Sequence, residues 1–391
     1  MRVLVNAPSV REGGSLVVLE YLLESMARLR PDIDWALAAH RSLRFSRNPP
    51  ENLVCVDIGD IDRGCFGAQQ WYELGLPSAV VRLGVNVVFS ITNYLPIRML
   101  PCPTVLLVQH AGHFSDVFDR LQCRHLRRAD RIAAWRLKTL WVQRSVRMAT
   151  EVTVQTAALA DAIAARTGRS RDKIHVTPHG PGLTREPPSQ RSKMSVRPVR
   201  IGYITKWGVQ KNFDVLFAAV KRWTAAGREV RLVLTLDPNL AENMRLLARA
   251  KAMGLFPLIE NVGNKDAASI SALYHSLDIF VFPSLVESFG FPLVEAMAKG
   301  LPVVAADTAS NREVAGNAGS YFSPFDSEAL ATMLGRIIDD PSLRQHKAAA
   351  ALARAQHFSW ERAAEQTLVL LAAAAGAAAF DAMPRKSMRT T

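Results

Sequence analysis

The sequence predicts an α/β protein of two domains, each a parallel sheet covered by helices. The chain has 391 residues, which is more than one common hydrophobic core holds. Short apolar strands alternate with helical patterns through both halves, and this alternation is typical of parallel sheets. Between the halves, residues 178–198 are rich in proline, serine and arginine and have no periodicity. That composition predicts a linker.

We expect seven strands in the first half of the chain and five in the second. Each is a run of valine, isoleucine, leucine or phenylalanine that suits a buried parallel strand. The predicted strands are 2–8, 34–39, 53–58, 85–90, 104–110, 151–156 and 173–178 in the first half, and 199–204, 230–236, 257–262, 278–283 and 302–307 in the second.

The most informative stretch is Pro283–Val304, PSLVESFGFPLVEAMAKGLPVV. It follows the predicted strand 278–283 with a Ser-Phe-Gly turn, and Pro292 suits the first turn of a helix. A helix N-terminus next to a tight loop can bind a phosphate through its unpaired N–H groups. Two carboxylates, Glu287 and Glu295, stand around this turn with seven residues between them. They would repel a diphosphate but suit the hydroxyls of a sugar and a ribose on either side of one.

Two glutamates at this spacing are, taken alone, more often the surface of an amphipathic helix. The surrounding residues favour a binding site, because E-S-F-G-F-P-L-V-E resembles the E-x7-E signature of the retaining glycosyltransferases of family 4. Three more segments match that family in the same order: IGYITKWGVQKNFDVLFAAV, ALYHSLDIFVFPS and HFSWERAAEQTL. The resemblance covers residues 198–368 closely and the earlier part of the chain loosely.

The resemblance implies the GT-B architecture, with two facing Rossmann-like domains and an interdomain cleft. We expect an acceptor-binding domain at 1–180, a linker at 181–198 and a donor-binding domain at 199–359. A C-terminal helix at about 360–380 should pack back on the first domain. Ligands in such folds sit beyond the carboxyl ends of the strands.

Lys206 and Lys211 follow the first strand of the second domain. An ammonium group can pair with a diphosphate and offset the charge that builds on it as the glycosidic bond breaks. Their place resembles the family's paired arginine and lysine, and a lysine at 206 keeps the charge without the bidentate geometry. Solvated surface lysines are the alternative interpretation.

By the same resemblance, Glu295 should hold the nucleotide ribose and Glu287 should face the donor sugar. Backbone N–H groups should come from the turn between them, at Ser288, Phe289 and Gly290. With His110, Lys206 and Lys211, Glu287 forms the predicted catalytic set.

The first half contributes Gly13 and Gly14, where glycine lets the backbone approach a ligand closely. A glycine pair alone is often just a turn, but this one coincides with the family's first-domain loop, so the resemblance implies that it lies against the donor diphosphate. We expect Ser15 to cap the helix that follows. His110 ends the strand 104–110 at the edge of the cleft, where a neutral ring nitrogen can bind a sugar hydroxyl. Gln109 and His113 are weaker candidates. His179, before Gly180, is expected at the interdomain hinge.

We expect no cofactor other than the nucleotide sugar as substrate, since no DxD-type metal cluster stands in a suitable loop. No residue is an obvious nucleophile for double displacement. The family resemblance implies a front-face reaction, in which the departing phosphate oxygen takes the acceptor proton.

The formal net charge of +13 favours an anionic partner. Between Arg120 and Arg147 the chain has nine Lys/Arg, one acid, and two tryptophans, Trp135 and Trp141. Basic residues beside tryptophan suit an anionic membrane surface. A cleft for an anionic acceptor or a solvated helix face explains the stretch as well. Nucleic acid is not expected, because no binding motif accompanies the charge.

A cytoplasmic location, with contact to the inner face of the membrane as an addition, fits the remaining signals. The four cysteines, Cys55, Cys65, Cys102 and Cys123, lack metal-ligand spacing and suggest reduced thiols. No apolar run reaches the length of a bilayer span, and the N-terminus enters a strand directly.

The sequence thus predicts a retaining glycosyltransferase. It would move a sugar from a GDP- or UDP-linked donor to a saccharide or lipid-linked acceptor, in cell-surface polysaccharide or glycolipid synthesis. The alternatives are a nucleotide-sugar epimerase or hydrolase on the same fold, and a non-catalytic protein that binds anionic surfaces.

Overall fold

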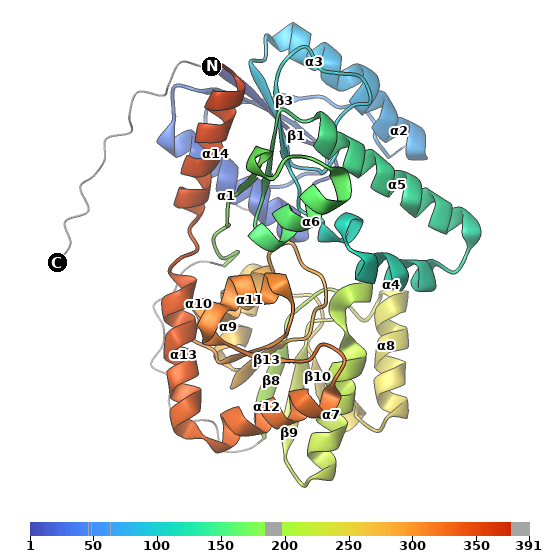
Figure 1. Ribbon diagram of the computed structural model, residues 1–391, viewed down its shortest axis with the longest axis vertical. Coiled ribbons are helices and arrows are strands. Elements are labelled where there is room, and N and C mark those ends of the chain that lie inside the picture. The colour runs from blue at the N-terminus through green and yellow to red at the C-terminus, as the bar shows by residue number, and fades with distance from the viewer. Residues whose placement is uncertain (46, 48, 63, 184–197, 377–391) are drawn as a thin grey trace, which may run out of the picture.

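The computed structural model describes residues 1–45, 47, 49–62, 64–183 and 198–376, with backbone only for 64–66. The two domains lie one above the other along the long axis of the molecule (Figure 1). Each is built on a sheet in which every pair of neighbouring strands is parallel. The predicted fold class, two Rossmann-like α/β domains, is confirmed.

The first sheet has seven strands in the order β3-β2-β1-β4-β5-β6-β7. Every residue of its central strands β4 and β5 is buried, which is why their sequences read as unbroken apolar runs. Its strands are β1 (Arg2–Ala7), β2 (Asp34–Ala39), β3 (Leu53–Val56), β4 (Val87–Ser90), β5 (Thr104–Leu107), β6 (Glu151–Val154) and β7 (Ile174–Val176).

Helices connect these strands. They are α1 (Gly13–Leu29), α2 (Gly64–Gln70), the π-helix η1 (Trp71–Gly75), α3 (Leu76–Leu83), the 3-10 turn η2 (Ala111–Phe114), α4 (Asp116–Leu126), α5 (Ala129–Met148), α6 (Ala157–Thr167) and the 3-10 turn η3 (Arg171–Lys173). The expected cap at Ser15 is wrong. Helix α1 begins at Gly13 without a side-chain cap, and Ser15 Oγ instead donates to the Glu12 carbonyl.

The second sheet has six strands in the order β10-β9-β8-β11-β12-β13. They are β8 (Val199–Tyr203), β9 (Val230–Leu234), β10 (Ile259–Asn261), β11 (Ile279–Phe282), β12 (Val303–Ala306) and β13 (Gly319–Phe322). The last strand was not predicted. Its sequence, GSYF, is short and half of it is glycine and serine, so it has no strand pattern of its own. It forms by pairing with β12.

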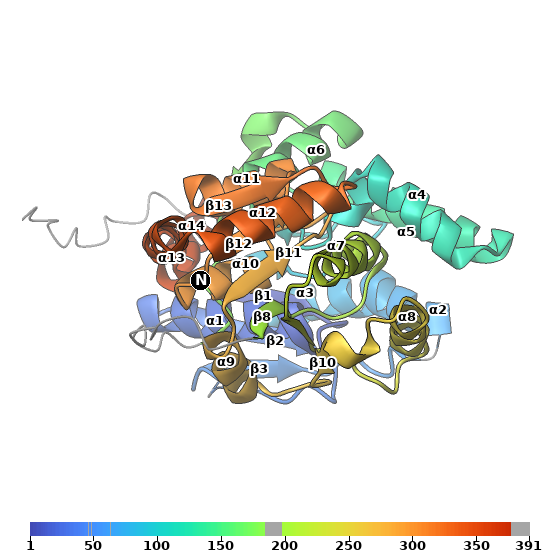
Figure 2. The same cartoon turned by 90° about the horizontal axis from the view of Figure 1, so that it is seen from below.

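The helices of the second domain surround this sheet (Figure 2). Side-chain caps begin several of them, as Asp266 does for α9, Thr308 for α11 and Asp326 for α12. The elements are η4 (Val209–Lys211), α7 (Phe213–Ala225), α8 (Ala241–Ala252), η5 (Phe256–Leu258), α9 (Ala267–His275), α10 (Phe291–Ala298), α11 (Ala309–Ala315), η6 (Gly316–Ala318), α12 (Ser327–Asp339) and α13 (Pro341–Ala355).

The last helix, α14 (Trp360–Ala374), leaves the second domain and lies along α1 of the first (Figure 1). Its Trp360 stacks on Tyr21, with ring centroids 5.1 Å apart, and donates from Nε1 to the Pro181 carbonyl at 2.7 Å. Trp360 and Leu368 are part of the first domain's core. Residues 377–380 of the expected helix, and 184–197 of the expected linker, lie outside the described residues.

The basic stretch 120–147 forms two helices instead of one. Helix α4 ends at Leu126, and Arg127 has a positive φ of 57° before α5 begins at Ala129. In the sequence, Arg124, Arg127, Arg128, Arg131 and Lys138 recur at a spacing that predicts one continuous basic helix, and this prediction is wrong.

Both tryptophans of the stretch bind groups of their own domain. Trp135 Nε1 donates to Asp119 Oδ1 at 2.9 Å, and Trp141 Nε1 donates to the Leu95 carbonyl at 2.8 Å. Neither indole is left to anchor a membrane through its N–H group. Among the described residues, no helix combines the length and the apolar character needed to cross a lipid bilayer.

Candidate active site

A largely buried ion pair joins the loop after β8 to the loop after β11. Lys211 Nζ is 2.6 Å from Glu287 Oε1, and the two side chains are 12% and 15% exposed. Ser284 Oγ also donates to this carboxylate, and the Leu285 N–H donates to the Gln210 carbonyl at 2.9 Å. These bonds tie the loop that carries Lys211 to the loop that carries Glu287.

The turn that follows Glu287 ends in the helix N-terminus that the sequence predicts. Gly290 precedes α10 with φ at +88°, where a Cβ atom would lie 3.2 Å from the Phe282 ring. The positive φ favours glycine here, and any side chain would also press on the buried Phe282 ring. Phe289 is a core residue, 1% exposed, so it holds the turn in place. The Ser288 carbonyl accepts from Thr156 Oγ1 of the first domain at 3.0 Å.

Glu295 lies on α10 and has different partners from the pair just described. Its Oε2 accepts from the Tyr274 hydroxyl at 2.9 Å, and the Gly182 N–H also donates to it. Desolvation raises the pKa of Glu295 to about 7, and the two hydrogen bonds and Lys299 only partly oppose this. The two glutamates of the motif thus occupy different environments.

Lys206 joins the second domain to the glycine loop of the first. Its Nζ is 3.2 Å from Glu12 Oε1, and a Cβ atom on Gly13 would be 3.6 Å from the same Nζ. Gly13 has φ +68°, and the neighbouring Gly14 lies against the Phe291 ring. Lys206 is 60% exposed, which makes its pair with Glu12 weak and easily exchanged for another anion.

His110 comes from the first domain and faces Glu287 of the second. Burial and, to a lesser extent, the Lys138 charge lower the pKa of His110 to about 4, although the Glu287 carboxylate acts in the opposite direction. The ring is therefore neutral near pH 7. Its buried Nδ1 has no partner among the described residues. A neutral histidine with a free ring nitrogen can bind a hydroxyl.

Gln109 and His113 hold the His110 loop in place. The Gln109 amide Nε2 donates to the Ile91 carbonyl at 2.7 Å. His113 stacks on Trp135 at 4.6 Å between ring centroids, and its Nδ1 lies 2.9 Å from Thr139 Oγ1. Burial lowers the pKa of His113 to about 3. We assign both residues a supporting role.

His179 is 1% exposed and packs between Phe291 and Trp360, at ring-centroid distances of 6.0 and 5.0 Å. Burial lowers its pKa to about 3. A Cβ atom on Gly180 would be 2.4 Å from Trp360. The chain thus leaves the first domain through a tight aromatic cluster.

Sequence reasoning missed Gln155. It directly follows β6, while Gln109 comes two residues after β5, so both lie beyond the carboxyl ends of neighbouring strands. Gln155 is 2% exposed, and neither amide atom has a partner among the described residues. Buried polar groups normally have partners, so this amide is available to a ligand or water. A lone glutamine gives no sequence signal.

Two further contacts join the domains and were also missed. The Glu313 carboxylate accepts from the N–H groups of Ala157 and Ala158, at 2.6 and 2.8 Å. It thereby caps helix α6 of the first domain from α11 of the second. Thr156 caps the same helix and binds the Ser288 carbonyl. The turn at Ser288 is therefore hydrogen-bonded to the first domain.

Replacing Glu313 by alanine is expected to lower the free energy of unfolding by about 1 kcal/mol, the usual size of a lost N-terminal cap. Urea unfolding followed by circular dichroism measures this. The exposed Glu51 offers a matched control, since Glu51→Ala removes the same charge from a loop. Equal stability of the two variants would contradict the role of Glu313.

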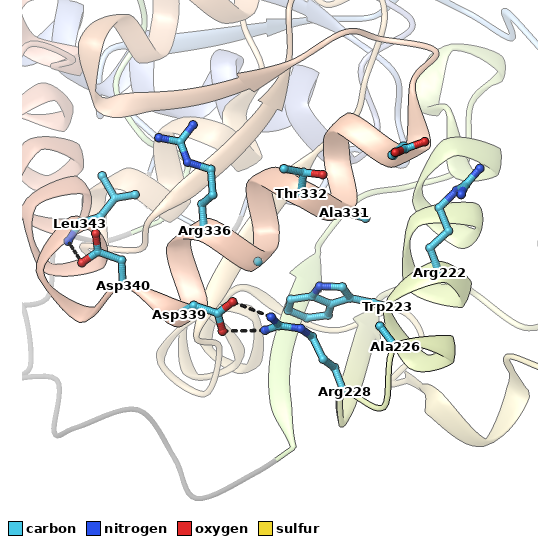
Figure 3. A pocket seen from close by; sticks show the side chains of 12 residues that line it. Arg222, Trp223, Ala226, Arg228, Ala331, Thr332, Arg336, Asp339, Asp340 and Leu343 are labelled. Carbon is cyan, nitrogen blue, oxygen red and sulfur yellow. Dashed lines mark hydrogen bonds and ion pairs between the residues drawn. The ribbon is translucent and has the colours of Figure 1, made fainter.

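Cavities border the second domain in different places. One, of about 610 Å³, lies between α7 and α12 and holds none of the predicted site residues (Figure 3). Arg228 there forms a two-bond ion pair with Asp339, at 2.6 and 2.5 Å. Another, of about 560 Å³, lies between the domains, where α4 faces α8. In the described part of the chain, no group of three or more His, Cys, Asp or Glu could hold a metal ion.

The sequence of the second domain matches a known family. Residues 198–340 match the model described as glycosyl transferases group 1. The O-antigen chain mannosyltransferase B of Escherichia coli is 41% identical over 124 residues, 32% of each chain. The MMP alpha-(1->4)-mannosyltransferase of Mycolicibacterium hassiacum is 28% identical over 206 residues, 51% of this chain and 48% of the relative. The chain thus spans about a third to a half of these curated relatives.

Solved structures match over almost the whole chain. Sucrose-phosphate synthase from Thermosynechococcus elongatus has a TM-score of 0.76 at 17% identity, over 97% of this chain and 100% of that one. The Anabaena protein HepE, in complex with UDP and glucose, has a TM-score of 0.68 at 18% identity, over 95% and 99%. At these identities the likeness concerns the fold. The chain therefore has the GT-B fold of the glycosyltransferases, and its second domain carries the sequence signature of the glycosyl transferases group 1.

Proposed function

We propose that the protein is a retaining glycosyltransferase that moves a sugar from a nucleotide diphosphate sugar to a saccharide or lipid-linked acceptor. The observation that carries this proposal is the largely buried Lys211–Glu287 pair at the head of a family-matched donor motif, with neutral His110 facing it from the other domain. A cation, a carboxylate and a hydroxyl-binding imidazole around one point are what a sugar diphosphate requires.

We assign the diphosphate to Lys206, Lys211 and the N-terminus of α10. Cations and N–H dipoles fixed at this point would stabilise the charge that grows on the leaving diphosphate. The exposed Lys206 can exchange Glu12 for a phosphate oxygen. Gly13 and Gly14 leave the backbone room beside that lysine.

Glu287 and His110 are assigned to the donor sugar, and Glu295 to the nucleotide ribose. Backbone N–H groups of Ser288, Phe289 and Gly290 are assigned to the sugar or its phosphate. The family resemblance implies that the acceptor proton goes to the departing phosphate oxygen. In that step the enzyme holds both substrates and excludes water, and no protein nucleophile is needed.

We propose that residues 1–180 with α14 form the acceptor domain, and residues 199–359 the donor domain, joined by 181–198. The two separate sheets and the cores around them support this division. The name of one relative, an O-antigen chain mannosyltransferase, supports cell-surface polysaccharide synthesis, and the UDP in the HepE complex supports a nucleotide-linked donor. We propose that the donor is GDP- or UDP-linked. The nucleotide sugar is a substrate, and no other cofactor is proposed.

We also propose a cytoplasmic location, with contact to the anionic inner face of the membrane. Helix α5 exposes Leu137 and Leu140, 67% and 57% exposed, and the exposed Arg136 lies one residue before the first and one turn before the second. Apolar and basic side chains together suit a membrane interface. Cys55, Cys102 and Cys123 are free thiols, which accords with a reducing compartment.

The two alternative functions would give different experimental results. An epimerase or hydrolase would consume the nucleotide sugar without an acceptor. A non-catalytic protein would bind anionic surfaces without binding nucleotides, and the intact Lys211–Glu287 pair argues against that decay.

A thermal unfolding screen with UDP, GDP and their sugars tests the proposal. A ligand at 100 times its Kd stabilises the folded state by about 2.7 kcal/mol, so the matching nucleotide should raise the Tm by several degrees. The corresponding mononucleosides serve as controls, because they lack the diphosphate that the lysines bind. If no UDP or GDP compound raises the Tm, the protein is not this kind of transferase.

A further inference from the structure

The cavity between the domains is lined by arginines from both. Arg124 and Arg127 come from the end of α4 in the first domain, and Arg245 and Arg249 come from α8 in the second. Its volume is about 560 Å³. Figure 1 shows α4 next to the end of α8 at the junction of the two domains. A monosaccharide with a charged substituent is smaller than this space.

The positive charge of this cavity is largely uncompensated. Arg249 pairs with Asp214. Within the described ranges, Arg124, Arg127 and Arg245 have no carboxylate at ion-pair distance, and Glu242 is the acidic residue that lines the cavity. Cations that two domains bring together repel one another unless an anion lies between them. Guanidinium groups bind phosphate and carboxylate oxygens through two N–H groups at once.

Arg127 is held on the rim of the cavity by an unusual backbone. It ends α4 with φ at +57° and ψ at −37°, a conformation that a residue with a side chain rarely adopts. The α4–α5 connection thus accepts strain where glycine would relieve it. A strained residue that carries charge into a cavity indicates a functional site.

Two aromatic rings also border the cavity. His125 and Trp207 come from different domains, with ring centroids 4.8 Å apart at 51°. Trp207 is partly buried against the core of the second domain, so its indole is held in place. An aromatic face next to cations suits a sugar ring that bears an anionic group.

The cavity adjoins the loop of the donor site. Trp207 directly follows Lys206, and α4 packs against η4, which ends at Lys211. A ligand in the cavity would therefore touch the loop that also carries both lysines.

We propose that this cavity binds the anionic group of the acceptor, and that the acceptor is a saccharide carrying a phosphate or a carboxylate. This inference rests on the proposed glycosyltransferase function. Among the sources of such a group, we assign a soluble or chain-borne anionic sugar in preference to a lipid headgroup, because the site is a cavity lined by two domains and not an open surface.

Titration calorimetry of the full chain with glucose 6-phosphate at low salt tests the proposal. The double variant Arg124→Ser/Arg245→Ser, which removes one cation from each domain, should weaken binding at least tenfold. Arg131→Ser/Arg136→Ser removes two cations from α5 outside the cavity and should leave binding within twofold of the unmodified chain. An equal loss in both double variants would reflect general surface charge and would overturn the proposal.

The variant Arg127→Gly distinguishes an effect on ligand binding from an effect on stability. It deletes a guanidinium and relieves the positive φ, so we expect weaker glucose 6-phosphate binding with unchanged or higher Tm. Unchanged binding in this variant and in Arg124→Ser/Arg245→Ser would overturn the site.

Co-sedimentation with phosphatidylglycerol vesicles distinguishes the two sources of the anion. Arg124→Ser/Arg245→Ser should leave vesicle binding as it is. If that variant loses vesicle binding while the unmodified chain binds no glucose 6-phosphate, the occupant is a lipid headgroup and our assignment is wrong. Nucleotide binding is scored separately by the thermal screen. A chain that binds glucose 6-phosphate in the cavity but no UDP or GDP compound would retain the anion site and lose its role as an acceptor site.

Discussion

Replacing Lys211 by methionine is expected to lower the rate of sugar transfer about 10²–10³-fold, the usual effect of removing one fixed group that stabilises transition-state charge. The same change should lower the free energy of unfolding by about 3 kcal/mol, because it leaves the Glu287 carboxylate buried without its cation. The geometry supports both effects: the pair is 2.6 Å long, and its two side chains are 12% and 15% exposed. Initial rates and urea unfolding measure the two quantities.

The double variant Lys211→Met/Glu287→Gln separates the chemical role from the structural one. With both charges removed, no carboxylate is left uncompensated, so most of the stability should return while the rate stays low. The exposed Lys221 on α7 gives the control Lys221→Met, which should change neither quantity. Recovery of the rate in the double variant would mean that the pair only holds the loops together.

The strands were predictable because buried parallel strands have a strong local signature. Runs such as Ile279–Phe282 are apolar throughout, since helices cover both faces of the sheet. Strand β13 was not predictable for the opposite reason. Gly319–Phe322 is a strand because β12 offers it a partner, and its own residues do not indicate one.

The residues of the donor motif were predictable, but the ion pair between Lys211 and Glu287 was not. Lys211 and Glu287 were each expected near the donor, on different groups of it. That they bind each other across 76 residues depends on how β8 and β11 lie side by side in the sheet. The helix break at Arg127 was hidden for a similar reason, because the stretch has no proline and a helical pattern on both sides.

The contacts between the domains could not be predicted from any local sequence pattern. Glu313 and Thr156 look like ordinary surface and cap residues in the sequence. Their roles arise because α11 of one domain faces the start of α6 of the other. Gln155 is similar, since its burial without a partner among the described residues is visible only once the sheet edge is built.

The buried environment of Glu295 could not be predicted from the sequence either. It makes the stability of the folded protein depend on pH. Its folded-state pKa of about 7 lies above its ordinary value of 4.5, because desolvation opposes the charged form. The folded chain therefore binds this proton more tightly than the unfolded chain does. The stability from this effect is complete below pH 4.5 and is lost as the pH rises through 7. Each tenfold difference in proton affinity is worth about 1.4 kcal/mol, so the total loss is at most about 3 kcal/mol.

Glu295→Gln should therefore remove most of this pH dependence and make the ligand-free protein more stable at pH 8, by up to about 3 kcal/mol. Urea unfolding at pH 5 and pH 8 measures this. Comparison with the unmodified chain subtracts the histidines that titrate in the same range. The amide oxygen of the substituted side chain can still accept from the Tyr274 hydroxyl, which keeps the local packing. Equal pH profiles for both chains would show that Glu295 is ionised throughout.

If the Glu295 carboxylate binds the ribose hydroxyls in its charged form, binding of a nucleotide sugar must release the proton of the Glu295 carboxyl group. The affinity of the unmodified chain should then fall about tenfold between pH 7.5 and pH 6, as the carboxylate becomes protonated. A nucleotide sugar is the right ligand, because its diphosphate has no proton to lose in this range. Calorimetry at pH 6 in buffers of different ionisation enthalpy counts the released proton, which should approach one per ligand. Glu295→Gln should release none and bind more weakly at pH 7.5, since its amide cannot accept from two hydroxyls with full charge. Binding that releases no proton in the unmodified chain would place the ribose elsewhere, and would leave Glu295 as a structural partner of Tyr274 and Gly182.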